Sequence, residues 1–149
     1  MTILLDGRKP EVLLVEDNEN DAILTRQGFK LAEVDVSLHH VTNGVECLAY
    51  LNREPPYESA PAPDLILLDL NMPAMNGEQV MEQIGTAAAL QHLPVVVLTT
   101  SSAPQDILRL YRLRCNSYIS KPVDYDAFVE MLQLLSQYWF SLVRLPVLE

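Results

Sequence analysis

Short aliphatic runs alternate with longer amphipathic stretches along most of this chain. Three of the runs, 12–15, 65–68 and 95–98, contain only Val, Leu and Ile. A strand that is apolar on both faces belongs inside a parallel sheet that helices cover on each side. Further strands are predicted at 34–41 and 117–119, where β-branched and aromatic residues recur.

The stretches between these runs carry apolar residues at helical spacing. They predict five helices, at 18–32, 44–53, 77–90, 104–114 and 124–142. Two serines and an alanine precede the proline that opens the fourth helix, so we expect a hydroxyl N-cap followed by proline in the first turn. Five strands alternating with five helices indicate an open α/β sandwich.

Composition narrows the class of protein. The 149 residues suit one domain, and 20 acidic against 10 basic side chains give a net charge of −10. Such a surface repels nucleic acid and anionic membranes, so we expect neither as a partner. Cys47 and Cys115 form no metal-binding motif, and no window has the roughly 20 apolar residues of a membrane span. We therefore expect a cytoplasmic protein.

Polar residues stand where four of the five predicted strands end. Glu16 and Asp17 follow the first strand, Asp69 the third, Thr99 the fourth and Lys121 the fifth. Ligands of open parallel sheets bind beyond the carboxyl ends of the strands, so these side chains are expected at one edge. One acid at a strand end is more often a helix cap or surface residue, but four matching ends favour a site.

The chemistry of this set indicates phosphoryl transfer. Carboxylates held together need a cation, and hard oxygen ligands beside open water positions suit Mg²⁺. Lys121 is expected to pair with Asp69 at rest and with a phosphoryl oxygen later. A carboxylate nucleophile, a hydroxyl donor and cations are the parts that such a transfer requires.

Four motifs, LLVEDN, LLDLNMPAMNG, VVVLTT and YISKP, resemble those of the receiver domain of two-component response regulators. The resemblance implies a flavodoxin-like, three-layer α/β/α sandwich with five helices and a five-stranded parallel sheet in the order 2-1-3-4-5. It covers residues 11–142 as the receiver domain, leaving an N-terminal segment, 1–10, and a C-terminal tail, 143–149.

The resemblance also implies residue roles. Asp69 would be the phosphoacceptor that takes a phosphoryl group from a sensor histidine kinase. Glu16, Asp17, Asp69 and the backbone carbonyl of Asn71 would hold Mg²⁺. The only catalysis implied is the protein's own phosphorylation and dephosphorylation, so we do not expect an enzyme acting on a separate substrate.

Further roles concern the fourth and fifth strands. Lys121 would bind a phosphoryl oxygen, and Pro122 would follow a cis peptide bond. Thr99 and Tyr118 would form a switch pair, in which the hydroxyl moves onto the phosphoryl group and the ring turns inward. Gly77 is expected where a side chain would crowd the acidic pocket.

Apolar residues on the last helix exceed what one buried face needs. A core stripe is predicted from the 3–4 spacing of Phe128, Leu132, Leu135, Trp139 and Leu142. The excess predicts a homodimer through the fourth helix, fifth strand and fifth helix, with Tyr111, Tyr138 and Phe140 as interface candidates. The alternative is a long helix that packs its own tail.

Too few residues follow the receiver pattern for an effector domain, so we expect a single-domain regulator whose output is a surface. The aromatic C-terminal stretch, LTTS and the proline-containing loop after the second helix are similar to stand-alone regulators paired with bacterial and cyanobacterial phytochrome kinases. This narrower resemblance implies light-dependent phosphorelay signalling.

Three other functions compete with a phosphorylation switch. A haloacid dehalogenase-type phosphatase would need an acid at Asn71, two positions beyond the nucleophile. A flavin-binding module would need a phosphate-cradling loop after the first strand, and a degenerate receiver would lack part of the set at the strand ends.

The adjacent His39 and His40 point to opposite faces of a strand, which is poor geometry for a shared metal.

Overall fold

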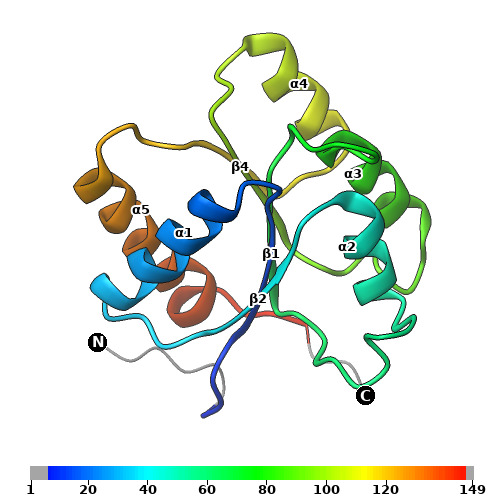
Figure 1. Ribbon diagram of the computed structural model, residues 1–149, viewed down its shortest axis with the longest axis horizontal. Coiled ribbons are helices and arrows are strands. Elements are labelled where there is room, and N and C mark those ends of the chain that lie inside the picture. Colours follow the sequence, from blue (N-terminus) through cyan, green and yellow to red (C-terminus); the bar gives the residue numbers. More distant parts are fainter. Residues whose placement is uncertain (1–6, 147–149) are drawn as a thin grey trace.

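The computed structural model describes residues 7–146 and contains one parallel five-stranded sheet (Figure 1). The strand order is β2-β1-β3-β4-β5, as the flavodoxin-like topology requires. The strands are β1 (Glu11–Val15), β2 (Ser37–Val41), β3 (Leu65–Leu68), β4 (Val95–Thr99) and β5 (Ser117–Ser120). Both the fold class and the strand order predicted above are confirmed.

Helices cover both faces of the sheet and complete the three layers. In Figure 1, α1 and α5 lie on one side, and α2, α3 and α4 lie on the other. The helices are α1 (Glu19–Leu31), α2 (Gly44–Leu51), α3 (Gly77–Thr86), α4 (Pro104–Arg112) and α5 (Tyr125–Gln137), followed by the π-helix η1 (Tyr138–Leu142). Within residues 7–146, no helix is long and apolar enough to cross a membrane.

The sheet separates two apolar cores because successive strand residues point to opposite faces. On β1, Leu13 and Val15 face the core under α2 and α3, whereas Val12 and Leu14 face the core under α1 and α5. All four residues of β3 are fully buried. This explains the unbroken aliphatic runs of the central strands.

β2 and α3 are each at least three residues shorter than predicted. β2 begins at Ser37, not at residue 34, because the Val34 amide turns back to donate to the Phe29 carbonyl at the end of α1. α3 ends at Thr86, not at residue 90, and Leu90 is buried from the following turn. Val34 and Leu90 are buried as expected, but they lie outside the strand and the helix.

The predicted hydroxyl cap of α4 is wrong. The N-cap residue is Ala103, which makes no side-chain cap, although Pro104 does occupy the first turn as expected. The Ser101 hydroxyl instead donates to Asp106 Oδ2 at 2.7 Å. Ser101 therefore ties the β4–α4 loop to the first turn of α4.

The end of the last helix departs from the predicted α-helical stripe. After Gln137 the chain widens into η1, and the Val143 amide donates to the Tyr138 carbonyl, five residues back. The wider turn rotates Phe140 into the core, where it is 3% exposed, and leaves Leu142 73% exposed. Phe140 is thus wrong as an interface candidate, and Leu142 is wrong as a core residue. Residues 1–6 and 147–149 of the expected terminal segments lie outside the described residues.

Candidate phosphoacceptor and divalent-cation site

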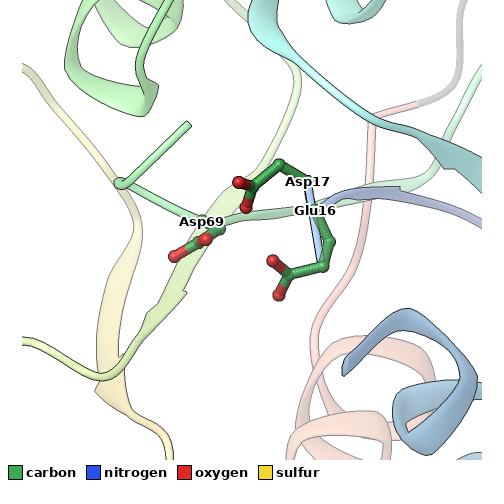
Figure 2. Close-up of side chains that lie close together, drawn as sticks. All are labelled: Glu16, Asp17 and Asp69. Carbon is green, nitrogen blue, oxygen red and sulfur yellow. The ribbon is translucent and has the colours of Figure 1, made fainter. Parts of the chain in front are cut away.

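Three carboxylates meet at the carboxyl edge of the sheet (Figure 2). Glu16 and Asp17 directly follow β1, and Asp69 directly follows β3. β1 and β3 are neighbouring strands, and Val15 pairs with Leu68. The residues that follow the two strands therefore leave the sheet side by side. One carboxylate oxygen from each acid lies within 4.8 Å of the others. The predicted convergence of these three acids is therefore observed.

The three acids differ in their surroundings. Glu16 is 2% exposed and Asp69 is 9% exposed, whereas Asp17 lies at the surface. The Leu70 amide donates to Asp69 Oδ1 at 2.9 Å. In the part of the chain that the structure describes, the Asp17 carboxylate has no hydrogen-bond or ion-pair partner. The cluster is thus closed on the Glu16 side and open at Asp17.

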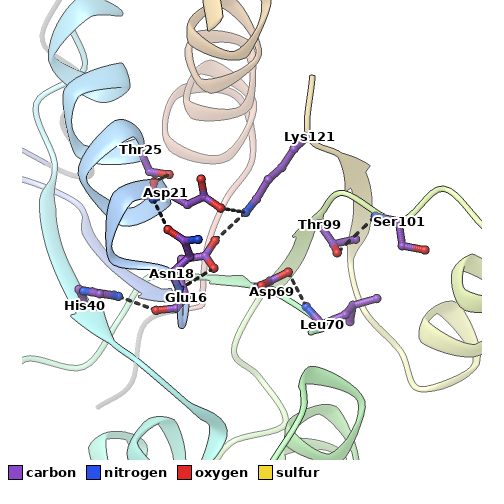
Figure 3. Close-up of polar contacts among 10 residues, drawn as sticks. All are labelled: Glu16, Asn18, Asp21, Thr25, His40, Asp69, Leu70, Thr99, Ser101 and Lys121. Atoms are coloured by element: carbon purple, nitrogen blue, oxygen red, sulfur yellow. Dashed lines mark hydrogen bonds and ion pairs between the residues drawn. The ribbon is translucent and has the colours of Figure 1, made fainter. Parts of the chain in front are cut away.

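Lys121 pairs with Glu16, and the expected resting pair with Asp69 is wrong (Figure 3). Its Nζ lies 2.5 Å from Glu16 Oε1 and 3.9 Å from Asp21 Oδ2. Glu16 is the most buried of the three acids, so its charge most needs a partner. The Lys121 amide also donates to the Thr99 carbonyl at 2.7 Å, which holds the lysine beside the cluster.

Burial raises the pKa of Glu16 to about 7, and the charge of Asp69 acts in the same direction. The hydrogen bond and charge of Lys121 oppose this rise in the pKa, as does a weak hydrogen bond from the Asn18 amide to Oε2 at 3.3 Å. Burial therefore outweighs the contacts with Lys121 and the Asn18 amide that favour the ionised carboxylate.

The donor set fits a divalent cation. When all three carboxylates are ionised, one ammonium leaves two negative charges, which such an ion would neutralise. All the donors are hard oxygens, and the open side at Asp17 leaves room for water ligands. Lys121 and the Asn18 amide already engage Glu16, so Asp17 and Asp69 are the freer donors.

The loop after β3 runs close beneath Asp69. The Gly77 amide donates to the Leu70 carbonyl at 3.1 Å, and a Cβ on Gly77 would lie 2.4 Å from the Asp69 carbonyl oxygen. The expectation that a side chain there would crowd the pocket is confirmed. Asn71 lies exposed in this loop, and its role as a carbonyl ligand stays a prediction.

Thr99 and Tyr118 are joined through Ser101 in the β4–α4 loop. Thr99 is fully buried at the end of β4, next to β3 in the sheet. The Ser101 amide lies 3.5 Å from Thr99 Oγ1, and the Tyr118 hydroxyl donates to the Ser101 carbonyl at 3.0 Å. The Ser120 hydroxyl donates to the same carbonyl at 3.2 Å. Ser101 thus connects the two proposed switch residues.

Pro122 does not follow a cis peptide bond, contrary to expectation. The only cis bond among residues 7–146 joins Pro55 to Pro56. The trans preference of a bond to proline is only about 0.5–1 kcal/mol, so residue type alone does not decide the isomer.

Comparison with known proteins decides the family. The model of the response regulator receiver domain matches residues 12–133. This chain belongs to the response regulator receiver family. It is a signalling protein, similar to response regulator Rcp1 of Synechocystis, with 36% identity over 135 residues that cover 91% of this chain and 92% of Rcp1. The probable methanogenesis regulatory protein FilR2 of Methanothrix harundinacea is 33% identical over 91% of this chain and 86% of its own.

Solved structures of receiver proteins share the whole fold. The phosphorylated cyanobacterial phytochrome response regulator RcpA is 36% identical with a TM-score of 0.87. Response regulator RPA3017, from red light signalling in R. palustris, is 30% identical with a TM-score of 0.89. The Mn²⁺-bound form of Rcp1 has a TM-score of 0.84. Each comparison covers 93% of this chain and 99% of the other.

Proposed function

We propose that this receiver accepts a phosphoryl group on Asp69 from a phosphohistidine of a sensor histidine kinase, in a reaction that depends on Mg²⁺. The observation that carries the proposal is the cluster of Glu16, Asp17 and Asp69, whose oxygens lie within 4.8 Å of one another. Lys121 lies beside this cluster as the ammonium that a transferred phosphoryl group needs.

The transfer forms one bond and breaks one bond. An oxygen of the Asp69 carboxylate attacks phosphorus, the P–N bond of the donor breaks, and the imidazole leaves with its electron pair. Asp17, Asp69, Glu16 and the Asn71 carbonyl would hold Mg²⁺, which when bound neutralises charge on the phosphoryl oxygens. Asp69 keeps a small exposed surface, through which the donor phosphoryl group would reach it.

Two side chains then bind the new acyl phosphate. We infer that Lys121 exchanges Glu16 for a phosphoryl oxygen and that the Thr99 hydroxyl donates to another. Hydrolysis by water returns Asp69 to a carboxylate and releases inorganic phosphate. The protein would catalyse only these reactions on itself.

The signal would leave through α4, β5 and α5. Movement of Thr99 would pull the β4–α4 loop and release the Tyr118 hydroxyl from the Ser101 carbonyl, so that the ring turns inward. Tyr111 and Tyr138 are 48% and 50% exposed, and they remain candidates for a homodimer interface on these elements. Sedimentation of Tyr111→Ser with Tyr138→Ser tests the interface, and an unchanged mass against a dimeric wild type would refute it.

An apolar surface beside the acids suits the kinase. Ile23 and Leu24 on α1 are 47% and 42% exposed, and Val123 in the β5–α5 loop is fully exposed. Leu24, Val123 and Lys121 line a cavity of about 330 Å³. A donor histidine must reach Asp69, so its carrier must cover the surface next to that residue.

The relatives support a phytochrome kinase as the partner and a light-sensing pathway, and we propose that the protein acts in the cytoplasm. RcpA is a cyanobacterial phytochrome response regulator, and RPA3017 acts in red light signalling. Transfer of phosphate from a phytochrome kinase, phosphorylated under red or far-red light, tests this partner. Equal transfer from an unrelated kinase would remove the assignment.

Acetyl phosphate tests the phosphoacceptor without any kinase. Intact mass is recorded after incubation with Mg²⁺ or with EDTA. The wild type should gain one phosphoryl group only with Mg²⁺, and Asp69→Asn should gain none. Asp126→Asn, which changes an exposed acid on α5, should behave as the wild type. Absence of the adduct on the wild type, or an adduct on Asp69→Asn, would refute the proposal.

A further inference from the structure

His40, near the end of β2, makes a hydrogen bond that the mechanism above does not use. Its Nε2 lies 2.7 Å from the backbone carbonyl oxygen of Glu16 (Figure 3). A carbonyl oxygen can only accept, so the imidazole donates from a protonated Nε2. The side chain thus reaches across from β2 to the peptide bond that joins Glu16 to Asp17.

This bond replaces one that the sheet no longer supplies. The Glu16 amide still donates to the Val41 carbonyl at 3.1 Å, but the pairing of β1 with β2 ends at Val15 and Val41. Among residues 7–146, no backbone amide after Val41 donates to the Glu16 carbonyl. The Glu16 carbonyl therefore receives an imidazole donor where a backbone donor of β2 would otherwise continue the ladder.

Asp17 depends on this peptide more than its neighbours do. The carboxylate of Glu16 is held by Lys121, and that of Asp69 is held by the Leu70 amide. Within the described part of the chain, no side chain or amide holds the carboxylate of Asp17. Because a peptide bond is planar, fixing the Glu16 carbonyl also fixes the direction in which Asp17 leaves the strand.

We propose that His40 is a positioning residue for divalent-cation binding: its hydrogen bond to the Glu16 carbonyl sets the peptide from which Asp17 reaches the ion. The inference rests on the proposed cation site. Partners that orient metal ligands typically change metal affinity by about 10- to 100-fold when they are removed. We expect about tenfold here, because His40 acts on the backbone of a ligand and not on its carboxylate.

The neighbouring histidine provides a matched control. His39 is also half-buried in β2, but its Nε2 lies 2.6 Å from Glu11 Oε2, at the opposite end of β1 from the acids. Its ring contacts Tyr50 on α2, with the ring centroids 6.1 Å apart. The two histidines thus lie in the same strand and are both half-buried, but they form hydrogen bonds at opposite ends of β1.

The test is Mn²⁺ binding, followed by the electron paramagnetic resonance signal of free Mn²⁺. His40→Ala and His40→Leu lack the donor and should bind about tenfold more weakly. His40→Gln can place an amide N–H near the position of Nε2 and should recover most of the affinity. His39→Ala should bind as the wild type, and melting in EDTA reports the fold of each variant.

Each outcome bears on a different claim. Equal binding by the wild type and His40→Leu would overturn the role of His40, as would equally weak binding by His40→Leu and His40→Gln. If His40→Ala fails to fold, the comparison of the leucine and glutamine variants still decides. No binding by the wild type would refute the cation site itself.

Discussion

The centre of the sheet and its β5 edge are built differently. The residues of β3 are fully buried, and Asp69, which follows the strand, is 9% exposed. β5 has no fully buried residue, and α4, which packs on this edge, buries only Leu110. The centre is thus fixed on both sides, whereas the edge is fixed on one.

In the proposed function, this difference separates the site of phosphorylation at the centre from the signalling surface at the edge. Acids that must hold a cation gain from strands that cannot shift, because misplacement weakens every ligand contact. A surface that changes on signalling comes from the less stable parts of a fold. The Ser101 carbonyl, which accepts the hydroxyls of Tyr118 and Ser120, joins the two regions.

The largest contrast should appear in core stability. Leu67→Ala at the fully buried centre of β3 should lower the free energy of unfolding by about 3 kcal/mol, through lost burial and a cavity. Leu108→Ala on α4, where the side chain is 51% exposed, should change it by less than about 0.5 kcal/mol. Urea unfolding measures both, and similar losses would erase the distinction between centre and edge.

Ion pairs should show the same contrast. In EDTA at pH 8, Lys121→Met should cost about 2 kcal/mol, because it leaves the buried Glu16 charge without its partner. Lys121 lowers the pKa of Glu16, so its removal raises that pKa, and the loss should shrink as Glu16 becomes protonated below about pH 7. A loss that does not depend on pH would contradict the pairing.

The matched pair at the edge is Arg109 with Glu78, 3.0 Å apart at the surface of α4 and α3. Arg109→Met should leave the melting temperature unchanged within error, since exposed ion pairs contribute little. A loss as large as that of Lys121→Met would show that the two pairs do not differ.

The link between the regions should be weaker. Tyr118→Phe removes the hydrogen bond to Ser101 and should lower stability by about 1 kcal/mol while leaving phosphoryl uptake intact. Tyr138→Phe is the control, because the Tyr138 hydroxyl makes no hydrogen bond within residues 7–146. Loss of uptake in Tyr118→Phe would place this tyrosine in the chemistry instead.

The smallest effect concerns the thiols. Burial raises the pKa of Cys47 to about 12 and that of Cys115 to about 11, so both stay protonated at pH 8. Ellman's reagent should react with neither until guanidinium unfolds the protein. Since the folded pKa values are raised, stability should fall as the pH passes about 9, where the unfolded thiols ionise. Rapid reaction of the native protein would show that these cores open.

Much of the fold could be predicted because the central strands are recognisable from their own residues. Buried strands are aliphatic throughout, and the topology places the acids that follow β1 and β3 at one edge. The π-helix could not be predicted, because Tyr138–Leu142 satisfies an α-helical pattern equally well. Tertiary packing decides between the two helix types, because Phe140 is buried in the core and Leu142 is exposed.

Pairing within the site was also beyond the sequence. Strand ends place Lys121 near three acids, but relative burial decides that it binds Glu16 and not Asp69. His40 carried no signal either, because its role depends on where the β1–β2 ladder stops. Interactions that depend on how deeply a side chain is buried, or on where the pairing of two strands ends, cannot be predicted from the sequence.

Asp69, and no other acid of the cluster, should carry the phosphoryl group. Borohydride reduces an aspartyl phosphate to homoserine, so peptide mass spectrometry after treatment with acetyl phosphate, Mg²⁺ and borohydride locates the acceptor. Homoserine should appear at position 69, and Asp17 should remain unmodified. Homoserine at position 17 with Asp69 intact, or no reduced residue in phosphorylated protein, would contradict it.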